Sequence, residues 1–248
     1  MSESGEEVRF SANGTNMVAL EKPGPHTYEA TWGGQKDTVS YTIASRSKST
    51  FYSKLMDREW ANRIGMTLVK VPGLLPGNRP GWVGKFEVTR DEYRKVMGGG
   101  PAGAAADARL PMADISYTDA AKFCDQLSTL ESVNGPPDYK GHYRLPTEAE
   151  WKIFAAKASF SNAVYVAAAP APVGSKGPSN DFGLCDVLGN VAEWLSSDDP
   201  VTKKYVGGSF NTTNKGFRKE RAFTEAMEWD SKQHSEEVGL RVVYVPAQ

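Results

Sequence analysis

The sequence predicts an α+β fold with an irregular, loop-rich second half, and three observations support this. Apolar and polar residues alternate in several short segments before residue 90, as they do in half-buried strands. Three later segments begin with residue patterns that cap helices. Regular periodicity fades after residue 156, and residues 159–179 are rich in Ala, Pro, Gly and Ser, which predicts irregular structure.

The N-terminal part is expected to be a small β unit over residues 1–50. Glycine and proline residues separate its strand-like segments as turns. A connector over 51–64, helical around 53–61, is expected to lead to a main domain over 65–248. That domain opens with an alternating strand over 65–72. The strand-like segments of the N-terminal unit are residues 8–10, 17–20, 28–32 and 39–43.

The first predicted helix begins after Thr89. Thr89 and Glu92 have the spacing of a capping box, in which each satisfies the other's backbone N–H. Val88 before the cap and Tyr93 inside the helix form a hydrophobic staple that fixes how the chain enters the helix. The helix is expected to run to Gly98, and the glycine-rich and alanine-rich residues 98–106 to form a surface loop.

Two more helices follow from the same reasoning. Ser116 with Asp119 caps the second helix, and Thr147 with Glu150 caps the third, with Pro146 and Trp151 as its staple pair. Apolar residues recur along the second helix at spacings of three and four, so they should share one buried face. Those residues are Ala120, Phe123, Cys124, Leu127 and Leu130.

Charge and hydropathy narrow the class of protein. The chain has 248 residues, 29 basic and 30 acidic side chains, and a formal net charge of -1. Such a balance creates no field that would gather nucleic acid, so no nucleic-acid partner is expected. No apolar stretch is long enough to span a bilayer, and the polar start of the chain predicts no signal peptide in the sequence as written, which leaves its compartment open.

The chain contains two cysteines, Cys124 and Cys185. Cys124 lies on the apolar stripe of the second predicted helix and Cys185 lies in an apolar loop. Two reduced, buried thiols are therefore favoured over a disulfide.

Four segments carry a resemblance to a known family. They are Tyr143 to Trp151 (YRLPTEAEW), Gly183 to Trp194 (GLCDVLGNVAEW), Gly207 to Phe210 (GGSF) and Gly239 to Val243 (GLRVV). In this order they resemble the formylglycine-generating enzyme, or sulfatase-modifying factor, family over residues 65 to 245. The resemblance implies a modified C-type-lectin-like α+β fold.

The resemblance also shows which catalytic groups are missing. Enzymes of this family hold copper with two cysteines shortly after the Gly-Gly-Ser element, but residues 211–223 contain no cysteine. A Cu(I) thiolate site cannot be built from that stretch. Related iron-dependent sulfoxide synthases use three histidines, whereas His26, His142 and His234 are scattered here and are expected to be surface or capping residues. No copper or iron cofactor is therefore expected.

One structural metal ion is implied by the resemblance. Asp186, Gly189, Val191 and Glu193 stand where family members ligate Ca2+, with carboxylate oxygens from the first and last and backbone carbonyls from the other two. Hard oxygen ligands on a tight loop suit calcium, although the two carboxylates could instead only cap the loop. A second family calcium site, near Asn162, is expected to be incomplete.

Two arginines of the family motifs, Arg144 and Arg241, are expected to tie loops to the core. Their partners would be carboxylates such as Glu148 or Glu150, because bidentate arginine pairs satisfy acidic groups in loop-rich domains.

A recognition surface is expected over residues 211–237. Trp229 lies there in a polar segment, where an aromatic ring suits recognition of a protein or a glycan, although packing beneath the loop is an equal alternative. The candidate ligand-binding residues are Asn211, Thr213, Asn214, Arg218, Arg221, Trp229 and Asp230.

These observations leave three functional hypotheses. The first is a non-catalytic binding or scaffold module. A variable protein of a diversity-generating retroelement would be a special form of it. The second is a divergent oxidoreductase acting on a peptide or secondary metabolite, with Arg218, Glu220, Arg221 and Glu225 in its cleft. The third is a structural part of a larger exported assembly that docks through the N-terminal unit.

Overall fold

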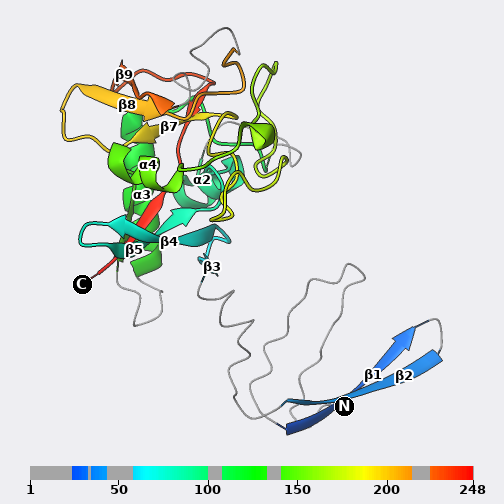
Figure 1. Ribbon diagram of the computed structural model, residues 1–248. Helices are drawn as coiled ribbons and strands as arrows, with labels where there is room; N and C mark the ends of the chain where they lie inside the picture. Colours follow the sequence, from blue (N-terminus) through cyan, green and yellow to red (C-terminus); the bar gives the residue numbers. More distant parts are fainter. Residues whose placement is uncertain are drawn as a thin grey trace. The chain divides into compact units, whose positions relative to one another are not determined.

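The computed structural model describes residues 24–32, 35–43, 58–99, 108–132, 141–213 and 224–247. It divides into two units, residues 1–56 and 57–248 (Figure 1). In the first unit β1 (Gly24–Trp32) and β2 (Gln35–Ile43) pair as an antiparallel hairpin. The strands expected at 28–32 and 39–43 are confirmed, and those expected at 8–10 and 17–20 lie outside the described residues.

A five-stranded antiparallel sheet organises one side of the second unit. Its order is β3-β4-β5-β11-β6, so the last strand of the chain lies between β5 and β6. The C-terminal segment is therefore an internal part of the sheet. The strands are β3 (Glu59–Ala61), β4 (Thr67–Leu75), β5 (Arg79–Gly84), β6 (Gly141–Arg144) and β11 (Val243–Pro246).

The helix expected around 53–61 is wrong for its last three residues, because 59–61 form β3 and pair with β4. The Trp60 ring contacts the rings of Trp82 and Tyr244, with centroids 6.1 and 5.4 Å away. Packing of this aromatic residue against the sheet outweighs the weak helical preference of the segment.

A second sheet has the order β10-β7-β8-β9. Its strands are β7 (Ala192–Leu195), β8 (Thr202–Val206), β9 (Met227–Asp230) and β10 (Val238–Gly239). β10 runs parallel to β7, and the other pairs are antiparallel. In Figure 1, α3 and α4 lie between the two sheets.

The three helices begin where their caps predict. They are α2 (Arg90–Met97), α3 (Tyr117–Ser132) and α4 (Glu148–Phe154). Thr89 and Thr147 each form a complete capping box, and Gly98 ends α2 in the left-handed region at φ 68°. Ser116 Oγ accepts the Asp119 backbone N–H at 3.1 Å. Residues 159–179 are irregular, as expected, apart from the short 3-10 helix Phe160–Asn162.

One residue of the predicted buried face of α3 is misplaced. Leu130 is 40% exposed, whereas Glu131 is 7% exposed and accepts the Arg63 backbone N–H at 3.1 Å. At about 100° per residue, position 131 falls inside the stripe set by residues 120, 123, 124 and 127, and position 130 falls about 20° outside its edge at Phe123. The three-residue spacing from Leu127 therefore predicts a buried Leu130, although this side chain lies just outside the buried stripe.

Two apolar clusters fill the second unit. One contains Trp194 and Leu240 with residues of α2, α3 and the five-stranded sheet, and the other contains Trp151 with residues of β4, β8 and the loop before β7. Cys124 and Cys185 are both buried and reduced, as expected. None of the helices in the described part of the chain is long and apolar enough to cross a membrane.

The cap of α4 provides a test of the fold. Thr147→Ala removes the side chain that accepts the Glu150 backbone N–H, so the free energy of unfolding should fall by about 1 kcal/mol. Thr129→Ala on the exposed face of α3 is the matched control and should change it by less than about 0.5 kcal/mol. Urea melts of both variants measure the difference, and equal losses would contradict the capping role.

Candidate functional site

A cluster of buried charged side chains lies where the resemblance places the metal site. Glu87, Asp186, Glu193 and Arg241 have exposed fractions of 0–1%. They come from four separate parts of the chain: the loop after β5, the loop before β7, β7 itself and the segment between β10 and β11. Charges buried this deeply must be paired and hydrogen-bonded, so their partners decide what the cluster can do.

Arg241 holds the cluster together. Its Nε donates to Glu193 Oε1 at 2.8 Å, and Nη1 donates to the Gly84 carbonyl at 2.9 Å. Nη2 donates to the carbonyls of Cys185 and Asp186 at 2.8 and 3.1 Å. One guanidinium therefore joins β5, β7 and the loop that carries the expected calcium ligands.

The partner expected for Arg241 is wrong, and the partner expected for Arg144 is confirmed. Arg241 pairs with Glu193, not with Glu148 or Glu150, because β10 lies beside β7 and brings the two residues together. Arg144 pairs with Glu150 through two hydrogen bonds of 2.6 Å. Glu148 pairs instead with the exposed amines of Lys152 and Lys204.

The loop before β7 is tightly turned. Asp186, Gly189 and Asn190 have φ values of 53°, 79° and 58°, in the left-handed region. A Cβ at Gly189 would collide with the Val164 carbonyl, so only glycine fits there. Asp186 Oδ2 accepts the Gly174 backbone N–H at 2.5 Å, whereas its buried Oδ1 has no hydrogen-bond partner in the described part of the protein. An unsatisfied buried carboxylate oxygen is consistent with a cation ligand.

Asn190 and Glu87 support this loop, and sequence reasoning missed both roles. Glu87 Oε1 accepts the Val191 backbone N–H at 2.9 Å, and Oε2 accepts Asn190 Nδ2 at 2.6 Å. Asn190 Oδ1 accepts the Ala171 N–H at 2.9 Å. Glu87 belongs to the Glu-Val-Thr element, which the sequence singles out, but no pattern indicated that it reaches residues 190 and 191.

The buried cluster contains more acidic than basic side chains. Burial raises the pKa of Glu87 well above its ordinary value, and the charge of Asp186 raises it further. Burial likewise raises the pKa of Glu193, against the opposing effect of Arg241, and that of Asp186. The three carboxylates are buried with one guanidinium, that of Arg241, and Arg109 also lowers the pKa of Asp186. A further cation would relieve the remaining repulsion among the carboxylates.

The expected calcium ligands lie on one loop and one strand, with Glu193 Oε2 also accepting Trp151 Nε1 at 3.3 Å. Across the described ranges, no three His, Cys, Asp or Glu side chains are grouped in a way that could hold a metal ion. The expected site would have only two carboxylates, with its other ligands drawn from the backbone. Asn162, expected near a second site, donates to the Pro178 carbonyl at 2.5 Å.

A shallow hollow of about 490 Å3 lies next to the Gly-Gly-Ser element. Phe210 and Asn211 line it directly after that element, together with loops from three other parts of the chain. We call this feature the hollow. Its lining residues are Asp114, Ala167, Ala168, Phe210, Asn211, His234, Ser235, Glu236 and Glu237.

Hydrogen bonds fix the polar groups of the hollow. His234 Nδ1 and Asp114 Oδ1 are 2.8 Å apart, and both side chains are exposed. Asn211 Nδ2 donates to Glu237 Oε1 at 3.1 Å, and Ser209 Oγ donates to Glu237 Oε2. His234 is thus a surface residue, as expected, but the sequence did not indicate its pairing with a residue 120 positions away.

The predicted ligand-binding residues are only partly described. Asn211 lines the hollow, Thr213 is exposed nearby, and Asp230 is exposed at the end of β9. Asn214, Arg218 and Arg221, like Glu220, lie outside the described residues. His234, Glu236 and Glu237 lie within the predicted surface 211–237 but were not named as binding residues, and Asp114 lies outside that range.

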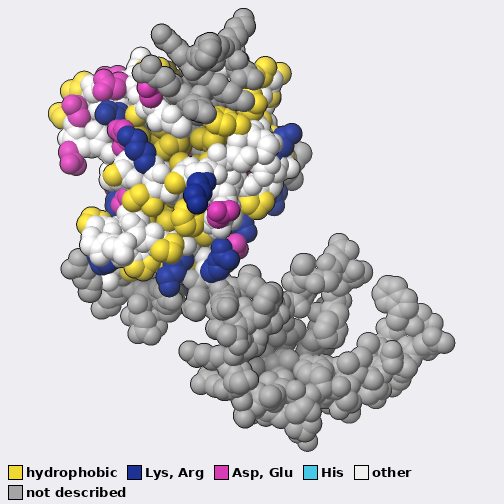
Figure 2. All heavy atoms as spheres, viewed as in Figure 1, with side chains coloured by type: hydrophobic (Ala, Val, Ile, Leu, Met, Phe, Trp, Pro, Cys, Tyr) yellow, Lys and Arg dark blue, Asp and Glu magenta, His cyan; other side chains and the backbone are white. Residues whose placement is uncertain are grey.

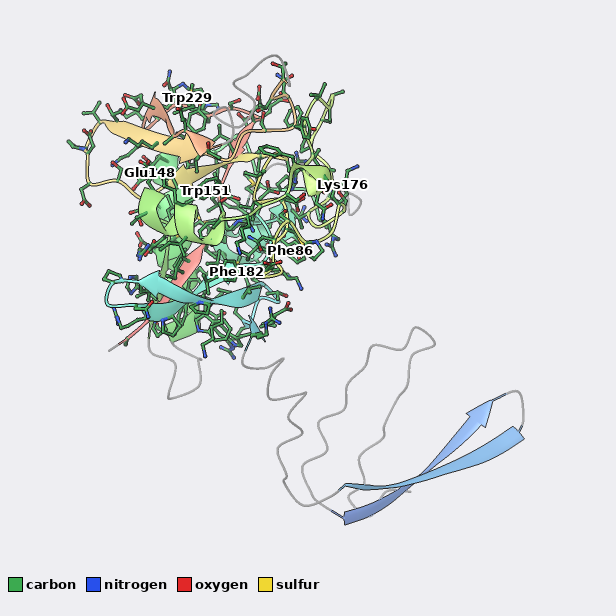
Figure 3. All side chains as sticks on the ribbon, in the orientation of Figure 1. Phe86, Glu148, Trp151, Lys176, Phe182 and Trp229 are labelled. Atoms are coloured by element: carbon green, nitrogen blue, oxygen red, sulfur yellow. The ribbon has the colours of Figure 1, made fainter. Side chains whose placement is uncertain are left out.

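Trp229 is half-buried on β9 (Figure 3). Its ring contacts those of Tyr205 and Trp194, with centroids 5.2 and 6.1 Å away. Packing beneath the loop is thus confirmed for part of the ring, and the recognition role of its exposed part stays a prediction.

Removal of Arg241 tests the buried cluster. Arg241→Met leaves three buried carboxylates without their guanidinium, so the free energy of unfolding should fall by about 3–5 kcal/mol. Lys85→Met is the control, because the Lys85–Glu59 pair has side chains 24% and 33% exposed and should contribute about 0–1 kcal/mol. Urea denaturation measures both, and comparable losses would show that the cluster is not a special source of stability.

Solved structures similar to this one include CarF, with 22% sequence identity and a TM-score of 0.54 over 68% of this chain and 87% of that one. Treponema denticola variable protein 1 has 19% identity and a TM-score of 0.54 over 91% of this chain and all of that one. PvdO from Pseudomonas aeruginosa has 16% identity and a TM-score of 0.56 over 76% and 98%. These likenesses confirm the expected α+β, C-type-lectin-like fold.

Two curated relatives match at the sequence level. Chaperone protein LppX of Paenibacillus barcinonensis is 26% identical over 171 residues, which span 46% of this chain and 60% of LppX. Inactive C-alpha-formylglycine-generating enzyme 2 of Bos taurus is 27% identical over 165 residues, which span 54% of this chain and 50% of the bovine protein. The chain therefore spans only about half the length of the curated relatives it matches.

The model of the sulfatase-modifying factor enzyme 1-like domain matches residues 78–170 and 166–245. These ranges cover most of the chain and include the buried cluster and the hollow. The protein therefore belongs to the FGE-sulfatase family, whose members carry the sulfatase-modifying factor enzyme 1-like domain.

Proposed function

We propose that this chain is a non-catalytic binding module that keeps the family fold and presents residues 211–237 to a protein or glycan ligand. The observation that carries the proposal is the absence of cysteine from residues 211–223, directly after the Gly-Gly-Ser element. The soft ligands that the copper chemistry of the family requires are missing from that stretch. The surrounding motifs and their packing are nevertheless intact.

The two cysteines of the chain do not replace the missing pair. Cys124 lies on the buried face of α3, and Cys185 lies in the loop before β7. Both are only 2–3% exposed. Burial raises the pKa of both thiols above the ordinary value, which disfavours the thiolate that would bind Cu(I). Neither thiol lines the hollow.

The hollow and the exposed part of Trp229 supply features that suit recognition. Asn211 offers an amide at the hollow, and Trp229 offers a ring whose other side is fixed by Tyr205 and Trp194. A rigid aromatic ring loses little conformational entropy on binding. The narrower role of a variable protein of a diversity-generating retroelement draws support from the match to Treponema denticola variable protein 1 over the whole of that chain.

Calcium is the cofactor that we propose, held by Asp186, Gly189, Val191 and Glu193. The buried Oδ1 of Asp186, which has no hydrogen-bond partner among the described residues, supports it, as does the excess of carboxylates over guanidinium in the cluster. A bound Ca2+ would supply charge compensation to the loop. Glu193 would serve two roles, because its carboxylate also accepts hydrogen bonds from Arg241 and Trp151.

A calcium titration tests that cofactor. Calcium at 100 times its dissociation constant should raise the free energy of unfolding by about 2.7 kcal/mol, seen as a higher melting temperature. Asp186→Ala should abolish the rise. Asp114→Ala is the matched control, because Asp114 has a similar positive φ of 60° but lies at the hollow, and it should keep the rise. A melting temperature that calcium leaves unchanged would contradict the proposed cofactor.

A copper experiment tests the non-catalytic role. The protein is titrated with Cu(I) and incubated in air with a cysteine-containing peptide, whose mass is then followed. We expect only weak copper binding and no protein-dependent loss of the thiol. Tight copper binding together with conversion of the cysteine would overturn the proposal and favour the divergent oxidoreductase.

The variable-protein role has a separate genetic test. The coding region for residues 211–237 should have a near-copy close to the gene, differing mainly at adenines. Sequencing of the locus in several isolates measures this. A locus without such a copy, and with an invariant 3′ coding region, would exclude the retroelement role while leaving the binding module intact.

A further inference from the structure

The charges around the hollow have mostly one sign. Asp114, Glu236 and Glu237 contribute carboxylates, and His234 is the single lining side chain that can carry positive charge among the nine described lining residues. Asp114 is oriented by His234, and Glu237 by Ser209 and Asn211. Carboxylates already held in place lose little conformational freedom when they bind a cation.

An exposed apolar residue borders the hollow. Val166 is 62% exposed and directly precedes the lining residue Ala167. Its φ of 51° is rare for a β-branched residue, and two backbone hydrogen bonds hold the segment: Val166 N–H to the Thr212 carbonyl and Ala167 N–H to the Phe210 carbonyl. Phe210 and two alanines also line the hollow. The ligand therefore meets apolar surface beside fixed negative charge.

The negative charge extends beyond the hollow. Figure 2 shows acidic side chains gathered at the end of the molecule where β8 and β9 lie. Glu228 and Asp230 on β9 are both exposed. Lys203 and Lys204 on the neighbouring strand β8 carry the opposite charge beside these two residues, so the carboxylates at the hollow itself are the groups that would favour approach of a positively charged surface.

We infer that the ligand of this surface is a protein that inserts a lysine or arginine side chain into the hollow and covers Val166 with a neighbouring apolar residue. The inference rests on the proposed binding function and specifies its partner. A glycan made of neutral sugars would bring no positive charge to the carboxylates and no apolar group to the exposed valine. A basic side chain flanked by an apolar one complements both.

The experiment uses the full chain, immobilised, and a displayed library of random twelve-residue peptides. The expected outcome is a selected pool enriched in Lys or Arg next to an apolar residue, with binding that weakens as salt is added. Asp114→Asn and Glu236→Gln should each weaken binding about tenfold, because each removes a charge at the hollow. Val166→Thr, nearly equal in shape, should also weaken it.

Matched variants separate charge from misfolding. Asn tolerates a positive φ as well as Asp does, so Asp114→Asn should keep the backbone at φ 60° and leave the melting temperature unchanged. Asp125→Asn, on the exposed face of α3 and outside the hollow, removes the same charge and should change binding less than about twofold.

Different failures point to different proposals. Peptides without basic residues that lose affinity in Trp229→Ala but not in Asp114→Asn or Glu236→Gln would overturn the cationic partner and leave the binding module standing. So would binding of a neutral oligosaccharide that these two charge variants do not affect. A library that yields no peptide sensitive to any of the three substitutions, with no oligosaccharide bound either, would count against the binding module itself.

Discussion

The ion pair between Glu193 and Arg241 is the interaction on which the rest of the second unit depends. Burying both charges costs free energy, and the cost is offset only because every nitrogen of the guanidinium has a partner. Those partners belong to β5, β7 and the loop before β7. Arg241 lies between β10 and β11, so the same residue also fixes how the end of the chain passes from one sheet to the other. A loop-rich domain with short strands needs a buried interaction that joins its loops, since the hydrogen bonds between its strands fix only a few residues.

The buried cluster is joined to the surface through its member Glu87 and through Asn190. Its side chain bonds to Glu87, and its backbone carbonyl accepts the N–H of Phe210 at 2.8 Å. Phe210 in turn lines the hollow and bonds to Ala167. A continuous set of hydrogen bonds thus joins the buried cluster to the floor of the candidate binding surface. The proposed calcium ion would stiffen the surface indirectly, by stabilising the loop from which Asn190 projects.

Local rules predicted much of this protein, and contacts between distant residues escaped them. Capping boxes place α2 and α4 correctly because Thr89 and Thr147 interact with residues three positions away. The Arg144–Glu150 pair is equally local. By contrast, Arg241 finds Glu193 only through the parallel pairing of β10 with β7, and Asp114 meets His234 only through tertiary packing. Family motifs indicated the loop of the proposed calcium site, but no motif marked the carboxylates of the hollow.

The hydrogen bond between Ser209 and Glu237, here called the clamp, affects which sequence changes the protein can tolerate during evolution. It closes the two ends of the segment that carries the candidate binding residues, independently of what lies between them. Loop-closure entropy grows only logarithmically, so doubling such a segment costs about 0.6 kcal/mol. Insertions and deletions there should therefore be cheap so long as the clamp and the Trp229 contacts remain. A hydrogen-bonded closure that leaves the length of the enclosed span open is the property required of a scaffold for rapid evolution or for laboratory libraries.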